Sequence, residues 1–281
     1  MSESIDRINM RTMTNASVVA QYARPSELSA AEQATLARVA PLARDKPILD
    51  IGVGGGRTVE ALRAISADYL GIDYSQDMVD ACRQRFPGVR FDLADARAMS
   101  AVADDSIFLA VFSCNGIGMV SHADRLQILR EVRRVLQPGG IFVFSTHNRN
   151  SPEYRRGFQF PQFQWTLHPL RAAVRLSRFA AQTALRLRNR RRFRPHEVHA
   201  DDYSVINDVC HHYGTMLYYV TLEKQRWQLE DAGFERDAEA FDLDGRPVHD
   251  DTAHDSIALI ARKPLLVADL SKSPEACRSP A

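Results

Sequence analysis

Apolar and polar positions follow a repeated order of buried strand, turn and amphipathic helix over the middle of the chain. Short apolar runs predict strands at 48–50, 69–73, 89–94, 106–112 and 141–145. Between these runs, helical spacing predicts helices at 59–65, around Met78 and Val79, and over 124–136. Each crossover from strand through helix to strand predicts parallel pairing, with helices on both faces of the sheet.

The pattern stops after the fifth strand and resumes at residue 221. Residues 221–230 have helical spacing, and closing strands are predicted at roughly 235–243 and 256–262. We therefore expect an α/β fold with a Rossmann-like, doubly wound, mostly parallel sheet of seven strands.

The expected divisions of the chain follow from this pattern. Within the interruption, two alternating segments predict a β-ribbon at 203–209 and 213–220. The expected units are a helical cap at 1–45, the sheet domain at 46–148 and 221–264, an insert at 149–220, and a disordered tail at 265–281.

The N-terminal cap shows one clear helix signal. Ser29 and Glu32 form a capping-box pattern, which predicts a helix through about Ala40 that Pro41 ends. Residues 1–15 are polar and are expected to be mobile.

A glycine-rich turn lies between the first strand and its helix. Glycines occupy positions 52, 54, 55 and 56, where they permit positive φ and close approach of a ligand to the backbone. The dinucleotide fingerprint requires a glycine where Arg57 stands, so that motif fails. Asp50 at the strand end disfavours a pyrophosphate and suits an ammonium or sulfonium ligand. Taken alone, this stretch is also consistent with an ordinary glycine-rich turn of an α/β protein that binds no ligand.

Acidic residues occur at three successive strand ends. Asp50, Asp73 and Asp95 are spaced by about 22 residues, so a parallel sheet would place them along one edge. A carboxylate at the second strand end is able to accept hydrogen bonds from both hydroxyls of a ribose. Three acids at three successive strand ends form a more specific signal than one acid at a single strand end.

These motifs, with the Gln137-Pro138-Gly139-Gly140 turn before the fifth strand, resemble the class I S-adenosylmethionine-dependent methyltransferases. The resemblance covers about 46–148 and 221–263 and implies S-adenosyl-L-methionine as cofactor. It implies that Asp95 and Ala96 lie at the adenine, that Asn115 lies near the reacting methyl, and that the insert forms a helical and β lid over the acceptor. The implied cofactor contacts are Tyr22, Asp50, Gly52, Gly54, Gly56, Asp73, Tyr74, Met78, Asp95, Ala96, Ser113, Asn115 and Ile117.

Methyl transfer from a sulfonium requires alignment and exclusion of water, and a base only if the acceptor must lose a proton. His147, just past the fifth strand, and His211 and His212 on the insert are the candidate bases. The alternative is loop histidines bonded to the backbone. His196 and His199 are three residues apart with no accompanying cysteine, and Pro195 disfavours a helix that would bring them together, so we expect no metal.

The insert holds most of the uneven charge. From Arg149 to Pro195 the sequence has twelve arginines and one acid, Glu153, a balance of 12 − 1 = +11. On a helical wheel, residues 170–187 form a basic amphipathic helix. Three interpretations remain open: a solvated face, a patch for an acidic acceptor or RNA, and docking on a membrane surface.

Composition bears on the cellular location of the protein. The chain has 281 residues, a net charge of +1 and four scattered cysteines without a CxxC motif. No secretory leader or membrane-spanning run is evident, so we expect a cytoplasmic protein. The oligomeric state is not indicated.

The leading hypothesis is a methyltransferase acting on oxygen or nitrogen of a small metabolite or peptide-like biosynthetic intermediate. An acidic acceptor is one form of this hypothesis. A tRNA or RNA methyltransferase is the second hypothesis and is not favoured. A non-catalytic module that binds the cofactor is the third.

Overall fold

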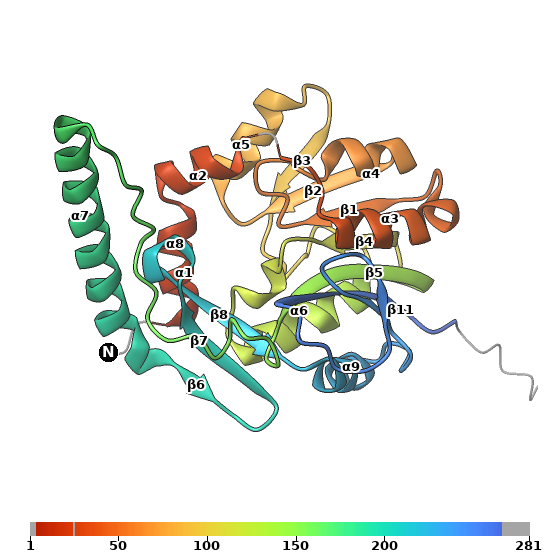
Figure 1. Ribbon diagram of the computed structural model, residues 1–281. Coiled ribbons are helices and arrows are strands. Elements are labelled where there is room, and N and C mark those ends of the chain that lie inside the picture. Colours follow the sequence, from red (N-terminus) through yellow and green to blue (C-terminus); the bar gives the residue numbers. More distant parts are fainter. Residues whose placement is uncertain (1–3, 25, 266–281) are drawn as a thin grey trace, which may run out of the picture.

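The computed structural model describes residues 4–24 and 26–265, and Figure 1 shows a twisted sheet with helices on both faces. The main path of the sheet has the order β3-β2-β1-β4-β5-β11-β9-β10. Its strands are β1 (Ile48–Ile51), β2 (Tyr69–Asp73), β3 (Arg90–Leu93), β4 (Ile107–Phe112), β5 (Leu136–Asn148), β9 (Glu239–Phe241), β10 (Pro247–Val248) and β11 (Ser256–Arg262). Strands β1 to β5 pair in parallel, whereas β11 is antiparallel to β5 and β9. The predicted fold class is confirmed, with β10 added at the edge.

Each face of the sheet has its own hydrophobic core. The helices on one face are α3 (Ala30–Ala43), α4 (Val59–Ile65) and α5 (Gln76–Arg85), and those on the other are α6 (His122–Val135) and α9 (Leu222–Asp231). Strand β4 shows the division, because Leu109 and Val111 join the first core while Ala110 and Phe112 join the second. Alternate side chains of a strand point to opposite faces, so β4 is buried on both sides.

The predicted ribbon extends the main sheet. It consists of β6 (Val198–His199), β7 (Tyr203–Asp208) and β8 (Thr215–Val220). Strand β8 pairs in parallel with the end of β5, where His147 lies opposite Tyr219 and Asn148 opposite Val220. The insert is therefore bonded to the sheet through the backbone. Its role as a lid over the acceptor stays a prediction.

The expectation of a mobile N-terminus was wrong for the described residues. Helix α1 (Ile5–Met13) begins at Ser4, whose side chain caps it, and α2 (Ala16–Tyr22) follows. Ile8 is fully buried in a third core, against Phe193 and the ribbon. The short apolar face of α1 was hidden among polar residues, and only its tertiary contact stabilises it.

Two predicted boundaries were also wrong. Helix α3 continues through Pro41 to Ala43, because a proline within the last turn removes only one backbone hydrogen bond and keeps a helical φ. Strand β5 begins at Leu136, before the Pro-Gly-Gly turn, and the pairing with β4 shifts register there. The glycines thus form an irregularity inside the strand.

The basic helix of the insert is present as α7 (Pro169–Phe193), which stands at the left edge of the molecule in Figure 1. Among the described residues, no helix is both long and apolar enough to traverse a bilayer. Of the predicted disordered tail, all but residue 265 lies outside the described residues.

Asn9 generates a stability prediction for the N-terminal helix. Its Nδ2 donates to the carbonyls of Met119 (2.6 Å) and Met216 (2.8 Å), and its Oδ1 accepts from the Met216 N–H (2.8 Å). Asn9→Ala leaves these buried groups unpaired, so we expect a loss of about 3 kcal/mol in the free energy of unfolding. Urea denaturation measures this. Thr14→Ala, which removes a bond within the same segment, is the control and should cost under about 0.5 kcal/mol.

Candidate active site

A cavity of about 380 Å³ lies above the carboxyl ends of β1, β2 and β4. In an open parallel sheet this edge is where ligands bind. Helix α2 closes the cavity from above, with Gln21 and Tyr22 in its lining. The volume is within the range of small-molecule sites.

The glycine-rich loop forms the floor, and its glycines serve different purposes. Gly54 has φ +53°, a Cβ there would meet nothing closer than the Gly52 carbonyl oxygen at 4.0 Å, and the residue lines the cavity. A Cβ on Gly52 would collide with the Phe112 ring at 2.7 Å, and one on Gly56 with the Phe86 ring at 2.5 Å. The absence of a Cβ at these two glycines therefore leaves room for aromatic rings of the protein to pack against the loop.

Gly55 is the point where the N-terminal helices meet the loop. A Cβ on Gly55 would lie 2.0 Å from the carbonyl oxygen of Tyr22. This close approach holds the end of α2 over the cavity and places the Tyr22 side chain in its wall. Burial raises the pKa of the Tyr22 hydroxyl to about 12, so it is protonated and able to donate.

Asp73, at the end of β2, organises the floor. Its Oδ2 accepts from the Gly54 N–H (3.0 Å) and its Oδ1 from the Ser75 N–H (2.9 Å). Each oxygen keeps a further acceptor site, and Asp73 lines the cavity. Burial raises the pKa of this carboxyl, and the backbone N–H groups oppose that rise. Nearby, the Ser75 hydroxyl is buried and has no hydrogen-bond partner among the described residues.

Asp50 is fully buried below the loop and does not line the cavity. Its Oδ2 accepts from Thr58 Oγ1 (2.5 Å) and Tyr69 Oη (2.8 Å). Burial raises its pKa to about 6, although these two donors lower it. Asp50 thus secures the start of α4, and a direct contact between its carboxylate and the cofactor has no support in this geometry.

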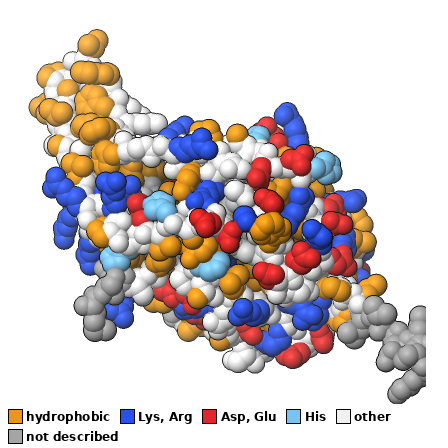
Figure 2. Space-filling view, turned by 90° about the horizontal axis from the view of Figure 1, so that it is seen from below, with side chains coloured by type: hydrophobic (Ala, Val, Ile, Leu, Met, Phe, Trp, Pro, Cys, Tyr) orange, Lys and Arg blue, Asp and Glu red, His pale blue; other side chains and the backbone are white. Residues whose placement is uncertain are grey.

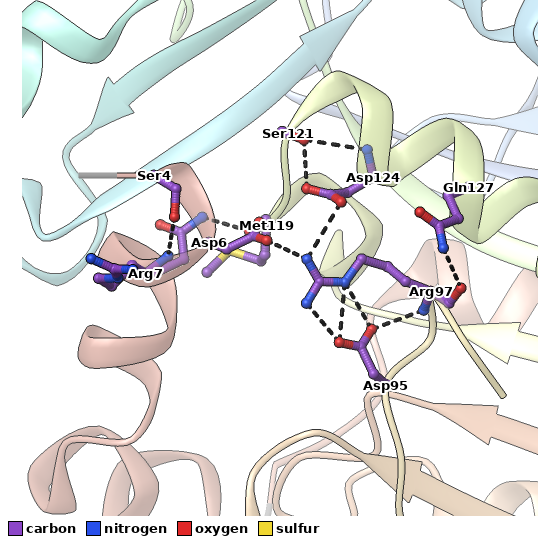
Figure 3. Close-up of polar contacts among 10 residues, drawn as sticks. Ser4, Asp6, Arg7, Asp95, Arg97, Met119, Ser121, Asp124 and Gln127 are labelled. Atoms are coloured by element: carbon purple, nitrogen blue, oxygen red, sulfur yellow. Dashed lines mark hydrogen bonds and ion pairs between the residues drawn. The ribbon is translucent and has the colours of Figure 1, made fainter. Parts of the chain in front are cut away.

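Asp95 lies beyond β3 in a smaller adjoining cavity that shares Tyr74 and Ala96 with the first. Arg97 donates a hydrogen bond from Nη2 to Oδ2 of Asp95 at 2.6 Å. Arg97 also forms ion pairs with Asp6 of α1 and Asp124 of α6, as Figure 3 shows. Burial raises the pKa of Asp95, but the bonds from Arg97 outweigh it and the pKa is lowered. The acid is therefore held charged at the rim.

Sequence reasoning missed Arg57, which lines the cavity from the loop. Both of its terminal nitrogens bond the Glu32 carboxylate at 2.5 Å. Glu32 also completes the capping box with Ser29, so one carboxylate ties the start of α3 to the loop. The signal was present, since the capping box and the glycine motif were both recognised, but their spatial pairing was not. Arg24, Ser75, Cys114 and Met119 were also missed.

The segment after β4 turns sharply. Cys114 and Asn115 have left-handed φ of 54° and 56°. Asn115 Oδ1 accepts from Ser256 Oγ (2.7 Å), and Asn115 does not line the cavity. Ile117, in η1 (Gly116–Gly118), is fully buried in the core. Neither placement supports the contact that the resemblance implied for these two residues.

Of the predicted cofactor contacts, the structure brings one group together around the cavity. This group is Tyr22, Gly52, Gly54, Asp73, Tyr74, Met78, Ala96 and Ser113. Their binding role stays a prediction, as does that of Asp95 in the adjoining cavity. Four predicted contacts lie outside the lining of both cavities, because they pack or form hydrogen bonds within the protein: Asp50, Gly56, Asn115 and Ile117.

None of the three candidate histidines is in the lining of the cavity. His147 stacks on Tyr219 at 5.1 Å and lies beside Gly118 rather than in the cavity lining. Burial lowers its pKa to about 4, so it is neutral at physiological pH. His211, in the left-handed turn α8 (Cys210–Tyr213), approaches Tyr22 with ring centroids 6.0 Å apart. His212 accepts from Arg186 of α7, away from the cavity.

Part of this chain is similar in sequence to a known domain family and to known proteins. Residues 48–140 match the model of the methyltransferase domain family. The chain is 32% identical over 120 residues to a ubiquinone biosynthesis O-methyltransferase of Thiobacillus denitrificans, covering 41% of this chain and 50% of that protein. It is 31% identical over 144 residues to a trans-aconitate 2-methyltransferase of Delftia acidovorans, covering 50% and 52%.

Solved structures share the fold. The CcbJ methyltransferase of Streptomyces caelestis has a TM-score of 0.60 at 17% identity, covering 88% of this chain and 96% of that one. The 1,6-didemethyltoxoflavin-N1-methyltransferase of Burkholderia thailandensis, which holds S-adenosylhomocysteine, has a TM-score of 0.51 at 14% identity, with 84% and 78% covered.

The chain matches the methyltransferase domain family over residues 48–140, which confirms, for that part, the resemblance to the class I S-adenosylmethionine-dependent methyltransferases found in its motifs. It spans about half the length of the curated relatives it matches.

The contact between Gly55 and Tyr22 generates a prediction. Gly55→Ala introduces a Cβ that overlaps the Tyr22 carbonyl, so α2 must move and the cavity loses part of its wall. We expect the affinity for S-adenosylhomocysteine to fall roughly tenfold, or about 1.4 kcal/mol. Calorimetric titration measures this. Gly157→Ala, where a Cβ meets nothing within 4 Å, is the control, and equal affinities of the two variants would contradict the role given to α2.

Proposed function

We propose that the protein transfers a methyl group from S-adenosylmethionine to oxygen or nitrogen of a small molecule. The observation that carries the proposal is Asp73, which is held by two backbone N–H groups and faces a cavity above a bare glycine backbone. Its two oxygens suit the ribose hydroxyls of an adenosyl group. The unpartnered Ser75 hydroxyl is a second polar group suited to a ligand in this cavity.

The residues around the cavity suit the other parts of the cofactor. Tyr74, Met78 and Ala96 offer apolar surfaces for an adenine ring, next to the charged Asp95. Arg24 supplies positive charge suited to the cofactor's carboxylate, whereas the charge of Arg57 is paired with Glu32. The cofactor, when bound, supplies an activated methyl on a sulfonium whose leaving group needs no protein acid.

The acceleration that the protein supplies is alignment of the acceptor and exclusion of water. Tyr22 of α2 lines the cavity together with Ser113 and Cys114, and we expect the acceptor to meet the methyl beside these residues. A base is required only if the acceptor must lose a proton. Because His211 adjoins Tyr22 in the wall, it is the best placed of the three histidines.

The relatives favour a small molecule as the methyl acceptor. They act in ubiquinone biosynthesis or on trans-aconitate, and one structural neighbour is an N1-methyltransferase of didemethyltoxoflavin. The cytoplasmic location and the division of the chain into cap, sheet domain, lid and tail remain part of the proposal.

The decisive experiment has two parts. Calorimetry should show binding of S-adenosylmethionine and S-adenosylhomocysteine but not of a nicotinamide or flavin nucleotide. Mass spectrometry of a small-metabolite fraction treated with protein and cofactor should show acceptors heavier by one methylene. Cofactor binding without any methylated component would favour a non-catalytic module, and absence of cofactor binding would remove the proposal.

A prediction follows for Asp73. Asp73→Asn provides one acceptor oxygen in place of two, so either Gly54 or Ser75 loses its partner along with one ribose contact. We expect the dissociation constant for S-adenosylhomocysteine to rise about 30-fold, or about 2 kcal/mol. Asp92→Asn on the neighbouring strand β3, which removes only a surface pair with Arg90, should leave it unchanged.

A second prediction concerns His147. Burial lowers its folded pKa to about 4, below that of an unfolded histidine, so it stays neutral from about pH 5.5 upward. If His147 serves the acceptor, His147→Gln should lower kcat without changing cofactor affinity, and the wild-type kcat should show no limb near pH 6.5 arising from this residue. Full activity of the variant would remove His147 from the mechanism, and a limb that disappears with it would contradict the low pKa.

A further inference from the structure

Helix α7 is turned with its apolar half toward solvent. Figure 2 shows hydrophobic side chains gathered on the projection at the upper left, with Lys and Arg side chains at its base. Trp165 and Leu170 are 88% and 74% exposed, among the largest exposures of any described apolar side chain. The apolar face of α7 and its lead-in segment consists of Trp165, Leu167, Leu170, Val174, Leu176 and Leu185.

The opposite face of α7 points toward the protein and combines arginines with Phe179, which packs on Phe163, and the buried Phe193. Arg175 Nη1 donates to the carbonyls of Gln164 (3.0 Å) and Trp165 (2.8 Å). Arg186 donates to Gln159 (2.7 Å), and Arg190 to Asn207 (3.0 Å). These bonds fix the rotation of the helix, so the apolar face cannot turn inward without breaking them. This is the reverse of the orientation expected for a helix that covers a core.

Arginines flank the apolar face. Helix α7 contains eight arginines and no acid. Arg171, Arg178, Arg188 and Arg191 are exposed. A contiguous exposed apolar surface of this kind marks an interaction site, and the surrounding charge indicates an anionic partner.

We propose that the apolar face of α7 docks on the surface of an anionic lipid bilayer. Leucine, valine and tryptophan side chains enter the boundary between headgroups and acyl chains, while the flanking arginines contact lipid phosphates. Tryptophan suits that boundary because its ring is apolar and its N–H remains polar. The inference goes beyond the proposed function, since it involves neither the cofactor nor the acceptor.

The charge pattern favours a bilayer over the two other occupants. In a symmetric dimer the same surface would meet itself, which would bring arginines against arginines with no acid on the helix to pair with them. RNA would require cations at the centre of the surface. Here the centre is apolar, and three of the eight arginines face inward.

Co-sedimentation of the full chain with vesicles tests the proposal. We expect binding to vesicles of phosphatidylcholine with 30% phosphatidylglycerol, and weak binding to phosphatidylcholine alone. The Leu170→Gln and Val174→Gln double variant should lower the bound fraction at least tenfold. Leu42→Gln with Leu243→Gln, which changes two leucines 43% and 40% exposed on other elements, is the matched control and should bind as the wild type does.

The arginines give a separate readout. Replacing Arg171, Arg178 and Arg188 by Gln should lower partitioning into the anionic vesicles by more than about tenfold, since each arginine near such a surface contributes roughly fivefold. The effect should diminish at high salt, which screens the attraction.

Fluorescence locates the contact. The chain has two tryptophans, so Trp227→Phe leaves Trp165 as the only one. Its emission should shift to shorter wavelength when anionic vesicles are added, and the same vesicles should protect it from a water-soluble quencher.

Three outcomes would overturn the proposal. The first is no sedimentation with anionic vesicles at low salt. The second is a dimer in light scattering that the Leu170→Gln and Val174→Gln variant dissociates, which would identify a second copy as the occupant. The third is salt-dependent binding of tRNA that competes with the vesicles and is unaffected by the leucine and valine changes. None of these outcomes bears on cofactor binding, so the proposed function stands or falls separately.

Discussion

The site depends on one constraint, the parallel register of β1 and β2. With Ile51 opposite Ile72, the glycine loop after β1 and the carboxylate at the end of β2 arrive at the same edge of the sheet. Asp73 then accepts hydrogen bonds from the N–H groups of both Gly54, nineteen residues before it, and Ser75, two residues after it, which joins the two loops. The carboxylate therefore shapes the floor of the cavity before any ligand is present, and the remaining wall residues are positioned relative to it.

Periodicity and motifs could predict the sheet and this floor because both are local in sequence. Strand β2 and helix α4 have the predicted bounds, and the strand-end acids follow from counting residues. Contacts between distant segments could not be predicted. Arg57 with Glu32, Arg97 with Asp6, and the approach of Tyr22 to Gly55 each join residues that carry no signal of their partner.

Arg125 is the clearest failure of pattern reasoning. It occupies a position on α6 that an arginine rarely takes, since it is fully buried. Its guanidinium donates to the Ile117 carbonyl, Thr146 and the side chains of Gln225 and Gln228. Within the described part of the chain it has no carboxylate partner, and burial lowers its pKa to about 10. Only the assembled fold supplies these acceptors, so a hydrophobicity pattern assigns Arg125 to the surface. Helix α7 was predicted as an amphipathic helix, but a wheel identifies an apolar half and not the direction in which it faces.

The pairing of β8 with the end of β5 has a mechanical consequence. A flap that swings over a site needs a hinge at its base, but here the base is a stretch of shared backbone hydrogen bonding between His147–Asn148 and Tyr219–Val220. The ribbon is therefore fixed to the sheet at this end, and a swinging movement of the ribbon would break these backbone hydrogen bonds. A movement that opens the cavity would instead involve the N-terminal helices, which contact the glycine-rich loop and are not paired with a strand.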